Sequence, residues 1–233
     1  GYGPLDRGLG RLDQAALARE AVRRLRVDVR PRDVLLHLRP PGAVDAELGF
    51  CHMRHLRNSA EVLAAMRDEV RRFVGDEWAE GQNAGAAPRV RLHGWQGEGQ
   101  VARADLSFVG QVQLFARCAL LVGTTSAGMT NMLFMPPSGV VLVLQPSEVA
   151  EFYAGFAAGL GHLPVVFFAR CAEDPLAGSP YEGLSIRACR HIVPCRNLAV
   201  NKCHVHVEDL SGFRRTFRSS LGFAFMAQHA RKK

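Results

Sequence analysis

The sequence has little lysine and no long, uninterrupted apolar run. Lysine occurs only at Lys202, Lys232 and Lys233, so nearly all basic residues are arginine. We interpret this as compositional bias. The stretch Phe152–Ala169 carries no formally charged residue, but several glycines and Pro164 interrupt it. It therefore predicts a helix and a strand of a folded core rather than a membrane span.

Acidic residues are absent from Ser211 to Lys233, a stretch that contains six arginines and lysines. The formal net charge is +7, so subtracting these six leaves +1 for the residues before them. The sequence contains no basic stripe interleaved with aromatic side chains, which is the pattern that binding to a single strand or to a DNA groove requires. The composition therefore argues against a nucleic-acid partner, and binding of nucleic acid through the basic tail is the least supported hypothesis.

Two kinds of catalytic or metal-binding motif are also missing. No G-x-S-x-G nucleophile elbow occurs, and the cysteines lack the paired spacing of zinc sites. One region is nevertheless rich in potential ligands: Cys189, His191, Cys195, Cys203, His204 and His206. We rank a metal site here below a Cys189–Cys203 or Cys195–Cys203 disulfide, and below unlinked side chains.

The chain is organised around one central stretch. Ala119–Val122 is an apolar run typical of a buried strand, and small residues follow it from Gly123 to Gly128. Met129–Met135 predicts a short helix, and Val140–Leu144 predicts a second buried strand. Strand, turn, helix and strand form half of a nucleotide-binding fold, whose helix N-terminus attracts phosphate. The alternative is a tight connection that binds no ligand.

Strands and helices alternate along the rest of the chain. Expected strands are Asp33–Leu38, Val90–His93, Val165–Phe168 and Cys203–Val207. Expected helices are Gln14–Leu25, one capped by Asn58 or Ser59, Phe108–Arg117, Glu148–Ala158 and one from Asp209 towards Phe217. This alternation predicts an α/β fold, with a Rossmann-like, mainly parallel sheet and helices on both faces.

Ligands of such sheets bind beyond the carboxyl ends of the strands. The residues expected there, besides the central turn, are Arg39, His93, Trp95, Gln145 and Arg170. We favour a sheet-edge hydrogen bond over a catalytic base for His93, and a core position over base stacking for Trp95.

Five pieces of the sequence belong together: Leu38-Arg39, the Arg54–Glu61 segment (RHLRNSAE), Gln111, Gly123–Asn131 and Phe134–Pro137. In these pieces the sequence resembles glycosyltransferase family 61. The resemblance extends from about residue 15 to about residue 215. It implies the carboxyl-terminal half of a GT-B-type enzyme, in which two Rossmann-like halves face each other.

The resemblance also implies an activity and a site. We expect inverting transfer of a sugar from a nucleotide-sugar donor, of the UDP-sugar type, to a glycan or protein acceptor in the lumen of the Golgi or endoplasmic reticulum. No metal ligand is assigned. The residues expected to bind the nucleotide sugar or its diphosphate are Arg39, Arg54, Asn58, Thr125, Ser126, Gly128 and Asn131.

We divide the chain into a lead-in helix and linker (1–30), a Rossmann-like nucleotide-sugar-binding domain (31–215) and a basic tail (216–233). The chain is expected to be a fragment without its amino-terminal half, where any membrane anchor would lie. It departs from the family where Thr125 and Ser126 replace a histidine and a glycine, and where Val143 replaces an acid. These departures motivate an alternative hypothesis of a non-catalytic binding or scaffold module.

Overall fold

The computed structural model describes residues 11–27, 33–38, 44–45, 50–51, 55–78, 89–93, 101–102, 107–146, 152–189 and 191–229. Within them lies a seven-stranded sheet in the order β5-β4-β1-β6-β7-β8-β9. The strands are β1 (Asp33–His37), β4 (Arg89–His93), β5 (Val101–Ala102), β6 (Cys118–Thr124), β7 (Val140–Pro146), β8 (Leu163–Cys171) and β9 (Val205–His206). A separate antiparallel pair joins β2 (Val44–Asp45) to β3 (Phe50–Cys51).

All neighbouring strands of the large sheet are parallel except β8 and β9. Strand order runs outward from β1 to β5 on one side, and then from β6 to β8 on the other. This is the order of a Rossmann-like fold, and it confirms the expected architecture. The order reverses between β1 and β6, so the two strands flank a topological switch point.

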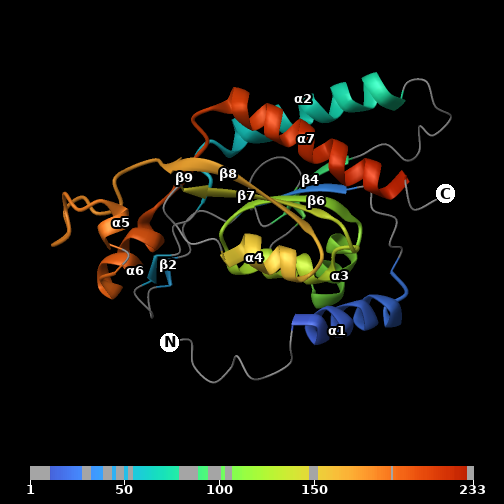
Figure 1. Ribbon diagram of the computed structural model, residues 1–233, viewed down its shortest axis with the longest axis horizontal. Helices are drawn as coiled ribbons and strands as arrows, with labels where there is room; N and C mark the ends of the chain where they lie inside the picture. Colours follow the sequence, from blue (N-terminus) through green and yellow to red (C-terminus); the bar gives the residue numbers. More distant parts are fainter. Residues whose placement is uncertain are drawn as a thin grey trace.

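Helices cover both faces of this sheet. The helices of the described residues are α1 (Arg11–Arg24), α2 (Ser59–Trp78), α3 (Phe108–Phe115), α4 (Phe152–Gly159), α5 (Ile186–Cys189), α6 (Val193–Lys202) and α7 (Leu210–His229), with the 3-10 helix η3 (Ala127–Phe134). Figure 1 shows α2 and α7 on one face and α1, α3 and α4 on the other. Ser107 caps α3 as expected, because its hydroxyl accepts a hydrogen bond from the Gly110 amide at 3.2 Å.

Alternate residues of each central strand enter opposite cores, because successive side chains of a strand point to opposite faces. On β1, Val34 and Leu36 pack with α2 and α7, whereas Leu35 packs with α3 and η3. Val143 on β7 is fully buried in the second of these cores. The position where the family carries an acid is thus an apolar packing position here.

Helix α7 crosses the boundary that we predicted at residue 215 and continues to His229. Residues 216–225 are therefore not a solvated tail, because Phe217, Leu221 and Phe225 on one helix face are buried in the core. Arg231, Lys232 and Lys233 lie outside the described residues.

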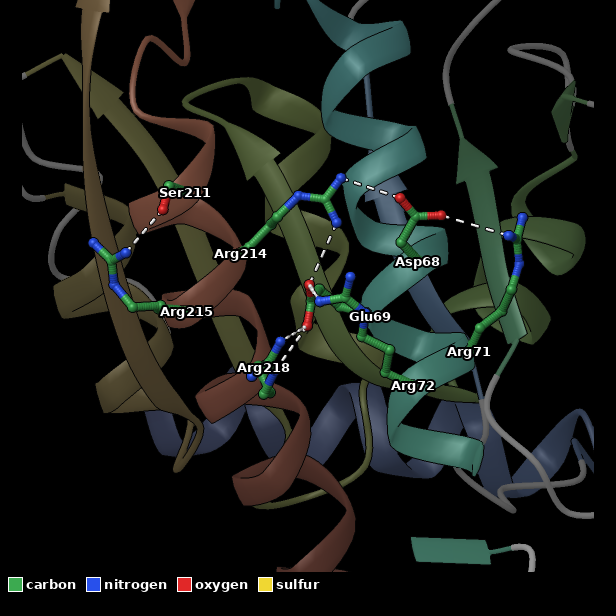
Figure 2. Close-up of polar contacts among 8 residues, drawn as sticks. All are labelled: Asp68, Glu69, Arg71, Arg72, Ser211, Arg214, Arg215 and Arg218. Atoms are coloured by element: carbon green, nitrogen blue, oxygen red, sulfur yellow. Dashed lines mark hydrogen bonds and ion pairs between the residues drawn. The ribbon is translucent and has the colours of Figure 1, made fainter. Parts of the chain in front are cut away.

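The interface between α2 and α7 contains a buried carboxylate. Glu69 has no exposed surface, and three arginines surround it. Arg218 Nη2 lies 2.6 Å from Glu69 Oε2, and Arg72 and Arg214 approach Oε1 at 3.3 and 3.4 Å. Figure 2 shows these side chains converging on Glu69, with Arg214 also reaching Asp68. Hydrogen bonding to Asp68 raises the pKa of Arg214.

Two disulfides join Cys171 to Cys203 and Cys189 to Cys195. Our alternatives, Cys189–Cys203 and Cys195–Cys203, were wrong because Cys203 lies beside the end of β8, where Cys171 and Val205 are paired. The first disulfide anchors the segment that contains α5 and α6, and the second joins these two helices. In Figure 1 both helices lie beyond the sheet, at the end where β8 meets β9.

Among the described residues, no helix is both long enough and apolar enough to span a membrane.

Candidate functional site

The carboxyl ends of β1 and β6 lie side by side at the switch point. His37, the last residue of β1, is in register with Gly123 of β6, and Thr124 follows as the last residue of β6. Position 39 follows two residues after β1, but Arg39 itself lies outside the described residues. In open α/β sheets, ligands bind in the crevice at such a reversal of strand order. The predicted turn therefore lies at the position where open α/β sheets in general bind ligands.

The turn after β6 leads directly into η3. Thr124, Thr125 and Ser126 are all buried, with relative exposures of 1%, 3% and 5%. Ser126 has an extended backbone at the N-cap position, and its side chain makes no capping hydrogen bond. The expected short helix is present, but it is a 3-10 helix that starts at Ala127 rather than at Met129. Its N-terminus offers backbone N–H groups and a positive dipole end at the edge of the sheet.

A histidine that we did not single out from the sequence completes this turn. Nε2 of His37 lies 3.0 Å from Oγ of Ser126, and both side chains are buried. The two residues are 89 positions apart in the chain. The only sequence signal was a histidine within an otherwise apolar strand, immediately before Leu38 and Arg39.

Asn131 has a partner within the protein. Its Nδ2 donates to Oε1 of Gln111 at 3.0 Å and thereby links η3 to α3. Next to it, His162 Nε2 donates to the carbonyl oxygen of Met132 at 3.0 Å. Burial lowers the pKa of His162, which keeps the ring neutral, while the bond to Met132 opposes this shift. These contacts fix η3 to α3 and to the residue just before β8.

Asn58 joins two parts of the fold that are far apart in the chain. Its Nδ2 donates to the carbonyl oxygen of Val207 at 2.9 Å, and its Oδ1 accepts from the Val207 amide at 3.1 Å. Its neighbours continue this pairing, because Leu56 forms a parallel bridge with Val205. The hydrogen bonds tie the start of α2 to the segment between β9 and α7. Arg54 lies outside the described residues.

Thr125, Ser126, Gly128 and Asn131 therefore lie together on the turn and η3, whereas Asn58 bonds the segment after β9. A buried thiol and a pair of histidines lie elsewhere. Burial raises the pKa of the Cys118 thiol on β6, so this cysteine is an inert core residue. The rings of His55 and His204 lie 4.0 Å apart between their centroids.

Sheet order, switch point and turn together define a Rossmann-like domain of the kind that binds nucleotides. Comparison with known families makes this more specific, since the Glycosyltransferase 61 family matches residues 23–142, a little over half of the chain. The chain therefore belongs to glycosyltransferase family 61. The matched region contains β1, α2, β6 and η3, whereas β8, both disulfides and α7 lie outside it. A comparison with curated proteins found no significant match.

Proposed function

We propose that this domain binds a nucleotide sugar, of the UDP-sugar type, and transfers its sugar to a glycan or protein acceptor. Membership of glycosyltransferase family 61 carries the proposal. The turn from Thr125 to Gly128 supports it, because it joins β6 to η3 at the switch point. Backbone N–H groups there, together with the guanidinium of Arg39, would bind the diphosphate.

In the proposed reaction, the acceptor hydroxyl oxygen forms a bond to the anomeric carbon of the donor. The bond between that carbon and the diphosphate oxygen breaks, and its electron pair stays on the diphosphate. The hydroxyl proton passes to a general base. Attack opposite the leaving group inverts the anomeric configuration. The turn and Arg39 assist by stabilising the charge that develops on the departing diphosphate.

The wider architecture belongs to the same proposal. We propose that residues 31–215 form one half of a GT-B-type enzyme and that the other half contributes to acceptor binding. Arg54 and Asn131 are proposed to support the nucleotide. Residence in the lumen of the Golgi or endoplasmic reticulum is supported by the two disulfides, because disulfides persist in oxidising compartments.

Isothermal titration with UDP, UDP-sugars and the nucleoside uridine tests the binding step. We expect heat on addition of UDP, weaker binding of uridine, and a loss of affinity for UDP in Arg39→Met. Arg215→Met is the matched control, because Arg215 is exposed on α7 and its guanidinium bonds the Ser211 hydroxyl, away from the turn. Absence of heat with every nucleotide would refute the proposal.

The departures at Thr125, Ser126 and Val143 support a second candidate, a domain that binds the nucleotide sugar without transferring it. Threonine cannot carry the charge of a histidine, and Val143 is fully buried in the apolar core. Release of UDP from a UDP-sugar, with or without an acceptor, distinguishes the candidates. Steady release by the protein excludes the non-catalytic module, whereas binding without release supports it.

A further inference from the structure

His37 occupies a space that two glycines create. A Cβ atom built on Gly128 would collide with Cε1 and Nε2 of the His37 ring. A Cβ atom on Gly123 would lie 3.3 Å from the His37 Cβ and 2.7 Å from the Met129 sulfur. The imidazole therefore packs directly against the backbone of the turn. Any larger residue at position 128 would displace it.

The His37 ring is also buried, and its position on the strand is fixed. His37 is only 7% exposed, and it follows Leu35 on the face of β1 that packs against η3 and α3. Its Nε2 is directed at Ser126 Oγ, 3.0 Å away. Ser126 occupies the N-cap position of η3, where a serine commonly bonds the amide of the second or third helical residue. Its side chain makes no such bond here and instead contacts His37.

The direction of this hydrogen bond determines what Ser126 offers to a ligand. A hydroxyl has one hydrogen to donate. If Nε2 accepts that hydrogen, Ser126 has none left for a ligand. If Nε2 carries a proton and donates to Oγ, the hydroxyl hydrogen points away from the ring and can reach an anionic oxygen. An anion at the N-terminus of η3 favours the second arrangement, because the donated hydrogen bond then ends on a negative charge.

We propose that His37 is a positioning residue that fixes the Ser126 hydroxyl as a hydrogen-bond donor to a phosphate oxygen of the bound diphosphate. The inference rests on the proposed function. It places an imidazole beside the turn, although the turn itself contains no histidine and has threonine at position 125. The histidine comes from the neighbouring strand and acts through the side chain of Ser126.

A double-mutant cycle in the full chain tests this coupling, with affinities for UDP and uridine as the readout. We expect Ser126→Ala and His37→Phe each to weaken UDP binding by about tenfold, as loss of a hydrogen bond to a charged group does. The double variant should lose no more than either single variant, because both remove the same bond. Uridine affinity should not change. His37→Gln should recover most of the UDP affinity, because its amide can also donate to Oγ.

His162→Phe is the matched control, because His162 also bonds η3, but through the carbonyl of Met132. It should lower the melting temperature and leave UDP affinity unchanged. If His37→Phe does not fold, the wild-type protein still gives an answer. In ¹⁵N spectra, the side-chain nitrogens of His37 should shift on addition of UDP and not on addition of uridine.

Three results would overturn the inference while leaving the proposed function intact. These are UDP binding that is unaffected by Ser126→Ala, additive losses in the double variant, or unchanged His37 nitrogens at saturating UDP. Failure of the wild-type protein to bind any nucleotide would instead overturn the proposed function, on which the inference rests.

Discussion

Two polar clusters in this domain differ in where their partners come from. At the α2–α7 interface, Glu69 is fully buried and three arginines bind its carboxylate. At the carboxyl edge of the sheet, His37 and Ser126 bond each other beside the N-terminus of a helix. The first cluster neutralises a buried charge within the protein. The second lies at the switch point, where this fold receives a ligand.

The difference separates a structural role from the binding role that we propose. A buried charge that is matched internally stabilises the contact between two helices and attracts no further ligand. Buried hydrogen-bond donors beside a helix N-terminus make their strongest interactions only when an anion is bound there. Asn58 belongs with the first class, because both ends of its amide bond Val207. Variants of the first class should therefore change the stability of the fold, whereas variants of the second class should change the affinity for UDP.

The largest effect is expected in the arginine cluster. Among the residues drawn in Figure 2, replacing Arg214 and Arg218 together by methionine leaves Glu69 paired with Arg72 alone. We expect a loss of about 3–5 kcal/mol in the free energy of unfolding, as for other broken buried ion pairs. Urea denaturation measures it, and the affinity of the folded protein for UDP should be unchanged.

Glu69→Met is the partner variant in this comparison. It should lower the free energy of unfolding by less than half as much. The side chains of Arg72 and Arg218 are more than half exposed, so their guanidinium groups can be solvated by water instead. Equal losses in the two variants would contradict the view that the buried carboxylate, rather than the arginines, needs the partner.

Asn58→Ala is expected to have the next largest effect. It removes both hydrogen bonds to the backbone of Val207 and leaves these buried groups unpaired, at a cost of about 2–3 kcal/mol. Thermal or urea unfolding measures this loss. UDP affinity should stay the same under conditions where the variant is folded. A large loss of UDP affinity with unchanged stability would instead favour the direct binding role that the family resemblance implies for Asn58.

Gly128→Ala should act mainly on the second cluster. The new methyl group meets the His37 ring, so we expect UDP affinity to fall more than tenfold and stability to fall by about 1–3 kcal/mol. Gly75→Ala is the matched control, because a Cβ there meets nothing within 4 Å and alanine favours the α2 helix. Its stability should rise slightly. Unchanged UDP affinity in Gly128→Ala would argue against binding at this turn.

The smallest effect concerns pH. Burial, followed by the nearby His204 and Arg57, lowers the pKa of His55, and Glu173 partly opposes this. The folded protein thus binds a proton on His55 less readily than the unfolded chain, whose histidine has a pKa of about 6.5. Stability should be full above that pH and decline as pH falls through the lower folded-state pKa. Unfolding curves of wild type and His55→Gln should differ in this slope, and identical slopes would contradict it.

The sequence predicted the parts of the fold that depend on local patterns. Apolar runs of strand length located β1, β6, β7 and β8, and Ser107 marked the start of α3. Their alternation with helices implied a parallel sheet, whose strand ends meet at one edge. The turn was also predicted from a local pattern, since its residues are contiguous. Its glycines, and the prolines that follow the short helix, act locally.

Partners could not be predicted in this way. Asn58 bonds Val207 across 149 positions and His37 bonds Ser126 across 89, and neither separation leaves a pattern in a single sequence. Both disulfides that we considered for Cys203 were wrong, because its partner Cys171 lies 32 positions away and comes close only where β8 pairs with β9. The end of α7 was missed because its arginines suggested solvent, whereas its phenylalanines pack on the sheet.

By itself, the sequence determined the alternating architecture, the turn and the family, because these depend on short segments read in order. Only the tertiary structure decided which polar side chains bond each other and which lie at the carboxyl edge of the sheet. The physical reason is that a buried hydrogen bond or ion pair is selected by the packing that removes water from both partners, and that packing exists only once distant segments have met.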